Sequence, residues 1–213
     1  MQFAYADGSG YARLGLARNP FLAEAEAGVE PGLWIARAGV PEPPEPGTRT
    51  LIQLIGPKGA GKTSHLLRWR ERVPGPYHYV PPTRDRWRFP PVAPLVYWDE
   101  VDRMGAAVRA AALGLAGVRG ATVVAGTHAD LTVPACRAGL AVQTYDFPGL
   151  TVAVLQQWAA LRIADAALPG RTPQLVLDAD TAAGICDRVG ASLREAAVDL
   201  HIWAADHARR AAE

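Results

Sequence analysis

The chain has 213 residues, of which 49% are apolar and 20% are charged. It is therefore long enough to bury a sizeable core, and its composition excludes a mostly disordered protein. A net charge of +1 excludes a basic field over the whole surface, so contact with nucleic acid would have to rest on a local patch. The two cysteines, Cys136 and Cys186, are too few for a disulfide framework and indicate a reducing compartment.

Neither the start of the chain nor its interior has the pattern of a targeting or membrane segment. The opening residues, MQFAYADGSG, contain no basic start and no apolar run. Arg109 breaks the longest apolar candidate, residues 104–118, before it reaches the about 18 residues of a membrane span. We therefore expect a soluble, cytoplasmic protein that does not act at a membrane.

Residues 1–50 are expected to be a lead-in and linker, because the proline-rich run at 41–47 is incompatible with a regular element. Residues 51–55, LIQLI, then form a short apolar run that a Gly-Pro pair ends, as expected of a strand buried in a parallel sheet. A helix is expected to follow over residues 63–72.

Further strands are expected in the core region, 51–147, and they alternate with helices or loops as in βαβ units. They cover residues 77–80, 95–98, 121–125 and 140–144. A helix is expected after the third strand, because four apolar residues recur there at helical spacing. These residues are Met104, Val108, Ala111 and Leu115.

Helical signals replace strand signals over residues 148–213. One apolar stripe is predicted from Val154, Trp158, Leu161 and Leu168. Ser192 and Glu195 form a capping box that predicts the start of the last helix. Its inward face is predicted to hold Leu193, Ala197, Leu200 and Trp203. The expected fold is α/β, a P-loop NTPase parallel sheet of about five strands with helices on both faces, followed by a small all-helical lid.

The first predicted strand leads into a phosphate-binding motif. Its residues fit G-x-x-x-x-G-K-[ST] between a strand and a helix, the context in which this pattern is specific. The nucleotide-binding segment comprises Gly56, Pro57, Lys58, Gly59, Ala60, Gly61, Lys62, Thr63 and Ser64. Backbone N–H groups of such a loop converge on phosphate oxygens at a helix N-terminus. We expect Lys62 to contact the β- and γ-phosphates and Thr63 to ligate Mg²⁺.

An acidic pair, Asp99 and Glu100, ends the third predicted strand. Beside a phosphate loop, an acid in this place holds Mg²⁺, and an adjacent glutamate acts as the general base on the attacking water. Exposed acids capping an ordinary strand end are the alternative. At the end of the fourth strand, Thr127 is favoured to bond the γ-phosphate or the attacking water, and an ordinary surface threonine is the alternative. His128 either takes this sensor role instead or caps the turn before Asp130.

The last helix and the approach to the fifth strand each carry an arginine. Arg194 lies in the first turn of its helix, where a cation is disfavoured unless an anion such as a γ-phosphate lies nearby. The alternatives are that it points to solvent or pairs with Glu195 or Asp199. Arg137 lies just before the fifth strand, and its alternative to a functional role is that of a surface arginine paired with Asp130 or Asp146.

Together these motifs resemble the AAA+ ATPase superfamily over about residues 18–210. The resemblance implies that Lys62, Glu100, Thr127, Arg137 and Arg194 are catalytic, with Arg137 as an arginine finger and Arg194 as a lid sensor. It implies that Thr63 and Asp99 hold Mg²⁺, and that Asn19 and Pro20 lie near the adenine. The segments 19–21 and 161–163 resemble the branch of transposition helpers, secretion-associated ATPases and origin-recognition proteins.

This resemblance implies ATP and ADP as ligands, hydrolysis of ATP, and a homo-oligomer whose assembly depends on nucleotide. The proline-rich segment 81–94 departs from the superfamily and disfavours threading of a polymer. A nucleotide-gated module for DNA or protein with little turnover is one alternative, and a P-loop kinase is another. For DNA the relevant residues are 84–88, RDRWR, which interleave an aromatic ring with arginines. A protein partner also remains open.

Overall fold

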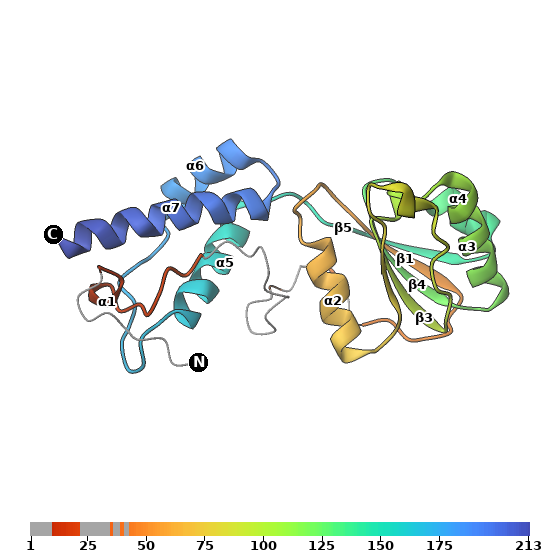
Figure 1. The fold of residues 1–213 in the computed structure, drawn as a ribbon, viewed down its shortest axis with the longest axis horizontal. Coiled ribbons are helices and arrows are strands. Elements are labelled where there is room, and N and C mark those ends of the chain that lie inside the picture. The colour runs from red at the N-terminus through yellow and green to blue at the C-terminus, as the bar shows by residue number, and fades with distance from the viewer. Residues whose placement is uncertain (1–9, 22–34, 36–38, 41–42) are drawn as a thin grey trace. The chain divides into compact units, whose positions relative to one another are not determined.

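The computed structural model describes residues 10–21, 35, 39–40 and 43–213. These residues form two compact units. One combines residues from 1–35 with residues 149–213 and is called the helical unit below; the other spans 36–148 and is called the α/β unit (Figure 1). Among the described residues, none of the helices combines the length and apolar character needed to cross a membrane.

The α/β unit is built on five parallel strands, as the sequence predicts. Their order across the sheet is β2-β3-β4-β1-β5. The strands are β1 (Thr50–Ile55), β2 (Tyr77–Tyr79), β3 (Leu95–Asp99), β4 (Thr122–Thr127) and β5 (Ala141–Asp146). The fourth and fifth strands end two residues later than predicted, so Thr127 belongs to β4 itself. Because β1 lies between β4 and β5, the loop after β1 lies beside the end of β4.

Helices cover both faces of this sheet (Figure 1). On one face α2 (Lys62–Arg72) packs through Leu66 and Trp69. On the other face lie α3 (Ala106–Val118) and α4 (Thr132–Arg137). Successive strand residues alternate between the two cores, so Ile52 packs beneath α2 while Leu51 packs beneath α3 and α4. This confirms the predicted sheet with helices on both faces.

The apolar stripe predicted after the third strand is wrong in two positions. The chain first forms a short 3₁₀ turn, η3 (Val101–Arg103), and α3 begins only at Ala106. Met104 is buried but precedes the helix, and Ala111 is exposed. The buried face of α3 consists of Ala112, Leu113, Ala116 and Gly117. Small residues form it because the helix approaches the chain closely: a Cβ on Gly117 would lie 1.9 Å from the carbonyl oxygen of Ala138.

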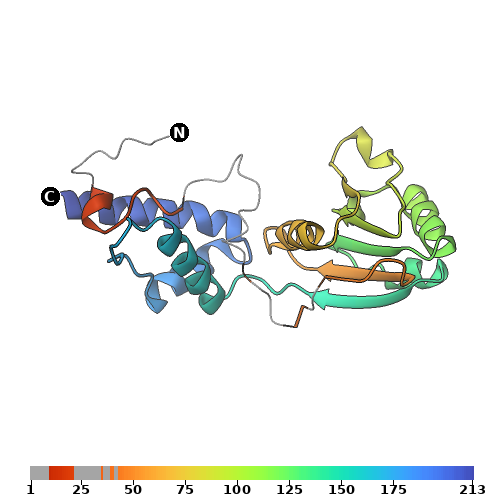
Figure 2. The same ribbon diagram turned by 90° about the horizontal axis from the view of Figure 1, so that it is seen from below.

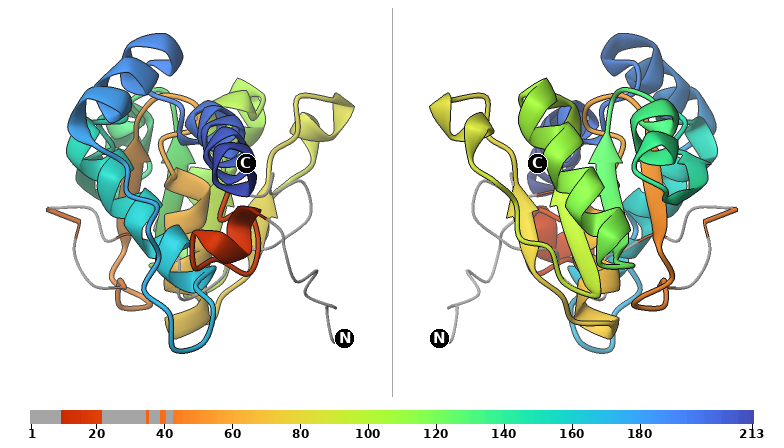
Figure 3. Two further views of the ribbon diagram at one scale, coloured as in Figure 1. Left: turned by 90° about the vertical axis from the view of Figure 1, so that its left-hand side faces the viewer. Right: turned by 90° about the vertical axis from the view of Figure 1, so that its right-hand side faces the viewer.

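The connection from β2 to β3, residues 80–94, contains a second 3₁₀ turn, η2 (Arg84–Trp87). It is drawn in yellow and projects from the edge of the sheet (Figures 2 and 3). Its base is fixed by the indole of Trp98, which donates to the carbonyl of Pro91 over 3.0 Å. The sequence predicts irregular structure for this proline-rich segment, and η2 is its one helical turn among the described residues.

Within its described residues, the helical unit contains four helices, which can be followed in Figure 2. They are α1 (Gly10–Arg13), α5 (Val152–Asp165), α6 (Ala179–Val189) and α7 (Leu193–Ala212). Residues 10–21 differ from the predicted lead-in, because Leu16 and Phe21 enter the core of this unit. Residues 1–9, 22–34, 36–38 and 41–42 of the predicted lead-in and linker lie outside the described residues.

Two further apolar stripes differ from the prediction. Leu168 lies beyond the end of α5, whose buried residues are Leu155, Ala159 and Ile163. In α7 the fully buried positions are Ala196, Leu200, Ala204 and Ala208, so only Leu200 of the predicted face is among them. Small residues again explain the difference, since a Cβ on Gly10 would lie 1.6 Å from the carbonyl oxygen of Ala208. The predicted cap is confirmed: Ser192 Oγ accepts a hydrogen bond from Glu195 N over 3.2 Å.

Candidate active site

The loop between β1 and α2 carries the phosphate-binding motif at the carboxyl end of the sheet. Gly61 lies at the N-cap of α2 with φ 93°, in the left-handed region that glycine adopts without strain. The next residue, Lys62, is buried, whereas Lys58 is exposed. The sequence therefore folds into a strand, a tight glycine turn and a helix N-terminus, which is the arrangement that presents backbone N–H groups to an anion.

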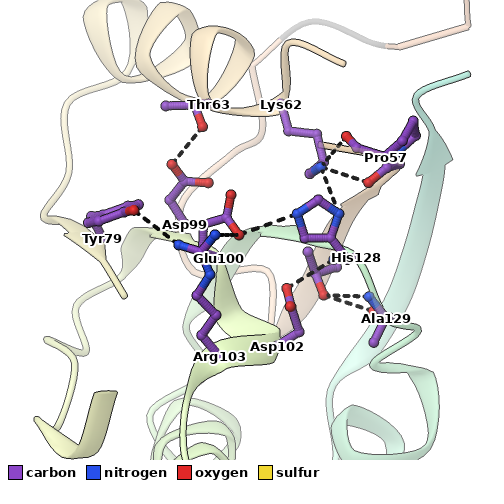
Figure 4. A network of polar contacts seen from close by, with 12 residues as sticks. Pro57, Lys62, Thr63, Tyr79, Asp99, Glu100, Asp102, Arg103, His128 and Ala129 are labelled. Atoms are coloured by element: carbon purple, nitrogen blue, oxygen red, sulfur yellow. Dashed lines mark hydrogen bonds and ion pairs between the residues drawn. The ribbon is translucent and has the colours of Figure 1, made fainter. Parts of the chain in front are cut away.

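Lys62 points back into its own loop (Figure 4). Its Nζ donates to the carbonyl of Gly56 over 2.7 Å and to that of Pro57 over 2.9 Å. Burial lowers the pKa of the Lys62 ammonium, while the charges of Glu100 and Asp99 act in the opposite direction. A buried ammonium held by two neutral carbonyls gains from an anion placed beside it.

Asp99 ends β3 and receives two hydrogen bonds at one oxygen. Thr63 Oγ1 donates to Asp99 Oδ2 over 2.8 Å, and the Tyr77 hydroxyl donates to the same oxygen over 2.8 Å. Burial raises the pKa of the Asp99 carboxyl, and these two hydrogen bonds oppose that shift. Burial, followed by the charge of Asp99, raises the pKa of Tyr77, so this hydroxyl keeps its proton and remains a donor.

The second oxygen of Asp99 indicates how this site would take a metal. Asp99 Oδ1 is buried and has no hydrogen-bond partner among the described residues. On β4, Gly126 lies opposite Asp99, and a Cβ there would be 2.6 Å from Asp99 Oδ1. An orphaned carboxylate oxygen close to a threonine hydroxyl is a donor set that suits Mg²⁺. The residues present therefore fit a magnesium ion held by Thr63 and Asp99.

Glu100 follows directly and adopts an uncommon backbone conformation. Its φ of 60° and ψ of 43° lie in the left-handed region. Among the described residues other than glycine, only Glu100 and Arg49 have a positive φ. Such a conformation costs about 1–2 kcal/mol for an ordinary residue. Glu100 Oε2 lies 3.1 Å from a guanidinium nitrogen of Arg103 and 3.3 Å from Nε2 of His128. Strain at a carboxylate beside a phosphate loop is typical of a functional position.

The structure brings His128, rather than the hydroxyl of Thr127, to the centre of the site. The His128 ring lies between Lys62 and Glu100, with Nδ1 3.4 Å from Lys62 Nζ (Figure 4). Its backbone N–H donates to Asp102 Oδ1 over 3.0 Å. Thr127 is fully buried and its hydroxyl donates to the carbonyl of Ala129 over 2.8 Å. Of the two residues between which the sequence leaves the sensor role open, His128 therefore lies beside Lys62 and Glu100, whereas the Thr127 hydroxyl bonds its own turn.

Arg137 lies at the other end of the sheet from this site. It is the last residue of α4, which leads back to the start of β5. It is exposed, and among the described residues it makes no side-chain hydrogen bond or ion pair. Asp130 does not pair with it, because the Asp130 carboxylate accepts from Gln53 and from the backbone of Thr132. Arg137 is thus free to contact another molecule, and it does not reach the phosphate loop that follows β1.

The remaining predicted residues, Arg194, Asn19 and Pro20, lie in the helical unit. Arg194 is exposed in the first turn of α7 and does not pair with Asp199, which binds Arg188 over 3.0 Å. Asn19 is buried; its side chain donates to the Tyr11 hydroxyl and to the His201 carbonyl. These contacts give Asn19 a structural role in its own unit. Its place near an adenine, with Pro20, remains a prediction, as does the lid-sensor role of Arg194.

Three residues of the site are missing from the sequence-based prediction: Tyr77, Arg103 and Gly126. Tyr77 is 22 residues before Asp99 and reaches it only because β2 pairs with β3. Arg103 joins Glu100 to the hydroxyl of Tyr79, which accepts from it over 3.0 Å (Figure 4). The spacing of Glu100 and Arg103 by three residues was the available signal for that ion pair.

No family model matches the sequence, and no curated protein matches it. Among solved structures, the chain is similar to the RuvB Holliday junction branch migration motor of Thermotoga maritima. The identity is 17%, the TM-score is 0.47, and the match covers 71% of this chain and 53% of RuvB. Two variants of the same RuvB match with TM-scores of 0.49 and 0.45 at 16% and 17% identity. The chain thus spans about half the length of these structures.

Proposed function

We propose that the chain is an AAA+-type P-loop ATPase that binds ATP with Mg²⁺ and hydrolyses it to ADP and phosphate. One observation carries this proposal: the loop after β1 and the end of β3 bring together an ammonium, a threonine hydroxyl bonded to a buried carboxylate, and a carboxylate on a left-handed backbone. These residues are Lys62, Thr63, Asp99 and Glu100. Membership of the branch of transposition helpers, secretion-associated ATPases and origin-recognition proteins stays a prediction.

Binding follows from the loop and its lysine. The N-terminus of α2 would present N–H groups to the β- and γ-phosphates, and Lys62 would exchange the carbonyls of Gly56 and Pro57 for phosphate oxygens. That exchange replaces neutral partners by an anion, which favours the charged ammonium whose pKa burial lowers. Mg²⁺, held by Thr63 and Asp99, would neutralise charge on the phosphates.

Hydrolysis requires a base that takes a proton from water. Glu100 is the carboxylate placed for this step, next to the metal-binding Asp99 and within ion-pair distance of His128. The water oxygen attacks the γ-phosphorus, its proton passes to Glu100, and the bond to the β–γ bridging oxygen breaks, so ADP leaves. His128, between Lys62 and Glu100, is placed to contact the γ-phosphate or the attacking water.

Assembly is the second part of the proposal. Arg137 is exposed and unpaired among the described residues, at the end of the α/β unit away from its own phosphate loop. An arginine in that place serves a neighbouring copy, where it would stabilise transition-state charge as an arginine finger does. The proposed homo-oligomer would therefore form in the nucleotide-bound state and complete each site with a residue from the next subunit.

A second candidate is a nucleotide-gated switch that binds a protein or DNA partner with little turnover. One observation favours it: Arg103 and His128 both contact Glu100 Oε2, so this oxygen of the proposed base is already engaged by two partners. A P-loop kinase has no such specific support among the described residues. Steady-state turnover separates the ATPase from the switch.

The deciding experiment pairs two variants. Lys62→Ala removes the phosphate contact and should abolish ATP binding, measured with a fluorescent ATP analogue. Glu100→Gln removes only the water-activating carboxylate, so it should retain binding and lose phosphate release. Glu71→Gln, an exposed acid of α2 paired with Arg68, is the matched control and should behave as the parent. Hydrolysis by Glu100→Gln at the parent rate would show that Glu100 is not the base.

A further inference from the structure

Large exposed aromatic side chains lie at the end of β2 and on the connection that follows it. Tyr79 at the end of β2 is 48% exposed, and Trp87 and Phe89 on the β2–β3 connection are 54% and 47% exposed. Among the described residues, these are the only aromatic members of the set of exposed large hydrophobic side chains. The connection that carries Trp87 and Phe89 projects from the sheet edge (Figure 3). Rings placed on a projecting segment are available to a partner rather than to the core.

Arginines alternate with these rings. Arg84, Arg86 and Arg88 are exposed, and none of them makes a side-chain hydrogen bond or ion pair within the described part of the chain. The Arg86 guanidinium lies 5.2 Å from the centroid of the Trp87 ring, a cation–π distance. Arg88 lies close enough to β2 that its charge, after burial, lowers the pKa of His78. Three cations without an ion pair on one segment, with only Asp85 between them, make a local positive surface on a chain of net charge +1.

The projecting segment is held in place although it is exposed. The Trp87 ring packs directly on Gly105, where a Cβ would lie 2.1 Å from a ring atom. Gly105 N donates to the carbonyl of Arg86 over 3.3 Å, and Val80 N donates to that of Asp99 over 3.0 Å. The segment is therefore fixed at its start and at η2, in addition to its base at Pro91. A preformed surface loses less conformational entropy on binding than a flexible one.

We propose that this surface binds single-stranded nucleic acid, with arginines on the phosphates and aromatic rings stacked on unpaired bases. The surface, called the arginine–aromatic surface below, comprises Tyr79, Arg84, Arg86, Trp87, Arg88 and Phe89. An acidic protein segment would use the arginines but not the exposed rings, and an apolar peptide would use the rings but not the cations. Alternating rings and cations without an ion pair match a strand whose bases and phosphates alternate. The proposal is independent of nucleotide turnover and goes beyond the ATPase.

The direct test is fluorescence anisotropy of a short labelled thymidine strand with the full chain. Each phosphate contact contributes about 0.7 to the salt slope for single strands, so three arginines predict a slope of about 2. Replacing Arg84, Arg86 and Arg88 by Gln should weaken binding at least about tenfold at about 50 mM salt and remove most of the slope. The matched control replaces three exposed arginines of the helical unit by Gln. These are Arg171, Arg209 and Arg210, so the net charge changes equally.

The rings are tested separately from the charges. Phe89→Ala and Trp87→Leu should each weaken the single strand by about tenfold, the size of one stacking contact, and leave the weaker binding of duplex unchanged. Trp87→Leu also changes the contact of Trp87 with Gly105. Phe89→Ala leaves that contact in place and therefore tests stacking without disturbing the segment. Ile202→Ala, which removes an exposed apolar side chain of α7, is the control and should bind as the parent.

Each contrary outcome removes the proposal. Absence of binding by the parent at low salt, with and without ATP, shows that the surface takes no nucleic acid. If the triple arginine variant binds the strand with the affinity of the parent, the strand binds elsewhere on the chain. If the parent binds duplex more tightly than the single strand, general charge attraction and not stacking explains the binding. The same conclusion follows if polyglutamate displaces the strand and the variants Phe89→Ala and Trp87→Leu bind it as the parent does. Lys62→Ala should bind the strand as the parent does without ATP, so a failure of the ATPase proposal leaves this result intact.

Discussion

The candidate site has two sides, each held in place by different interactions: the metal side around Asp99 and the glutamate side around Glu100. On the metal side, Asp99 is 1% exposed and receives two hydrogen bonds, from Thr63 and Tyr77. On the glutamate side, Glu100 is held by Arg103 and His128, whose side chains are 27% and 29% exposed. Buried hydrogen bonds fix a geometry, whereas part-exposed ion pairs are weak and screened by salt. The metal side is thus preorganised, whereas in the proposed function the glutamate side would change partners on nucleotide binding.

The largest effect is expected from a residue that would complete the glutamate side from a neighbouring copy. Arg137→Ala should bind ATP as the parent does yet hydrolyse it about 10³- to 10⁵-fold more slowly, the range of known arginine fingers. Turnover per subunit of the parent should rise with protein concentration, measured as phosphate release. Mixing Arg137→Ala with Lys62→Ala should restore some activity, because one chain supplies the intact loop and the other the intact arginine.

Arg119→Ala is the control for this experiment, since Arg119 is an exposed arginine at the same end of the sheet, just before β4. It should leave both the rate and its concentration dependence unchanged. A parent rate per subunit that is constant with concentration, together with full activity of Arg137→Ala, contradicts the shared site.

The second effect tests the metal side. Asp99→Asn keeps the shape of the side chain but removes its charge, so Mg²⁺ binding should fall and hydrolysis should slow by about 10²- to 10³-fold. Thermal unfolding supplies a readout besides activity: ATP with Mg²⁺ should stabilise the parent more than ATP with a chelator, and the variant should show no such difference. Glu71→Gln serves again as control. A variant that retains its magnesium-dependent stabilisation shows that Asp99 does not hold the ion.

The strands of the α/β unit were predictable because large apolar residues reveal them. Residues 51–55 and 95–98 are short apolar runs next to glycine, proline or acids, a pattern typical of strands buried on both faces. The helical faces were less predictable, since Gly117 and a series of alanines make close contacts that hydrophobic periodicity does not weight. Close helix packing selects small residues, and small residues carry little periodic signal.

The candidate site divides in the same way. Lys62 and Thr63 begin the helix that follows the loop after β1, and Asp99 and Glu100 lie at the end of β3. Their proximity could be predicted because parallel strands bring their ends to one edge of the sheet. The sequence left the sensor role open between Thr127 and His128, because the apolar core of β4 does not reveal that the strand continues to Thr127 and that the next residue, His128, lies beside Lys62. Tyr77 depends on which strand pairs with β3, and sequence spacing does not contain that information.

A smaller effect is expected from Tyr77→Phe, which removes one of the two hydrogen bonds to Asp99 Oδ2. That bond favours the ionised carboxylate, so its loss should raise the Mg²⁺ concentration needed for half-maximal hydrolysis by up to about tenfold. The maximal rate should change by less than about threefold. Tyr97→Phe is matched, because the Tyr97 hydroxyl donates to the Val73 carbonyl and not to Asp99. An equal magnesium requirement in both variants would remove Tyr77 from the metal side.

The smallest effect concerns the glutamate side. Arg103→Ala removes one of the two partners of Glu100, and a part-exposed ion pair contributes no more than about 1 kcal/mol. If that pair restrains Glu100 before the reaction, its loss should raise turnover by up to about fivefold, and high salt should raise the parent rate but not the variant rate. Tyr79→Phe removes the hydroxyl that accepts a hydrogen bond from Arg103 but leaves the ion pair of Arg103 with Glu100 in place. Its effect on turnover should therefore be smaller. A tenfold loss in Arg103→Ala, insensitive to salt, would instead make Arg103 a positioning residue and the glutamate side as fixed as the metal side.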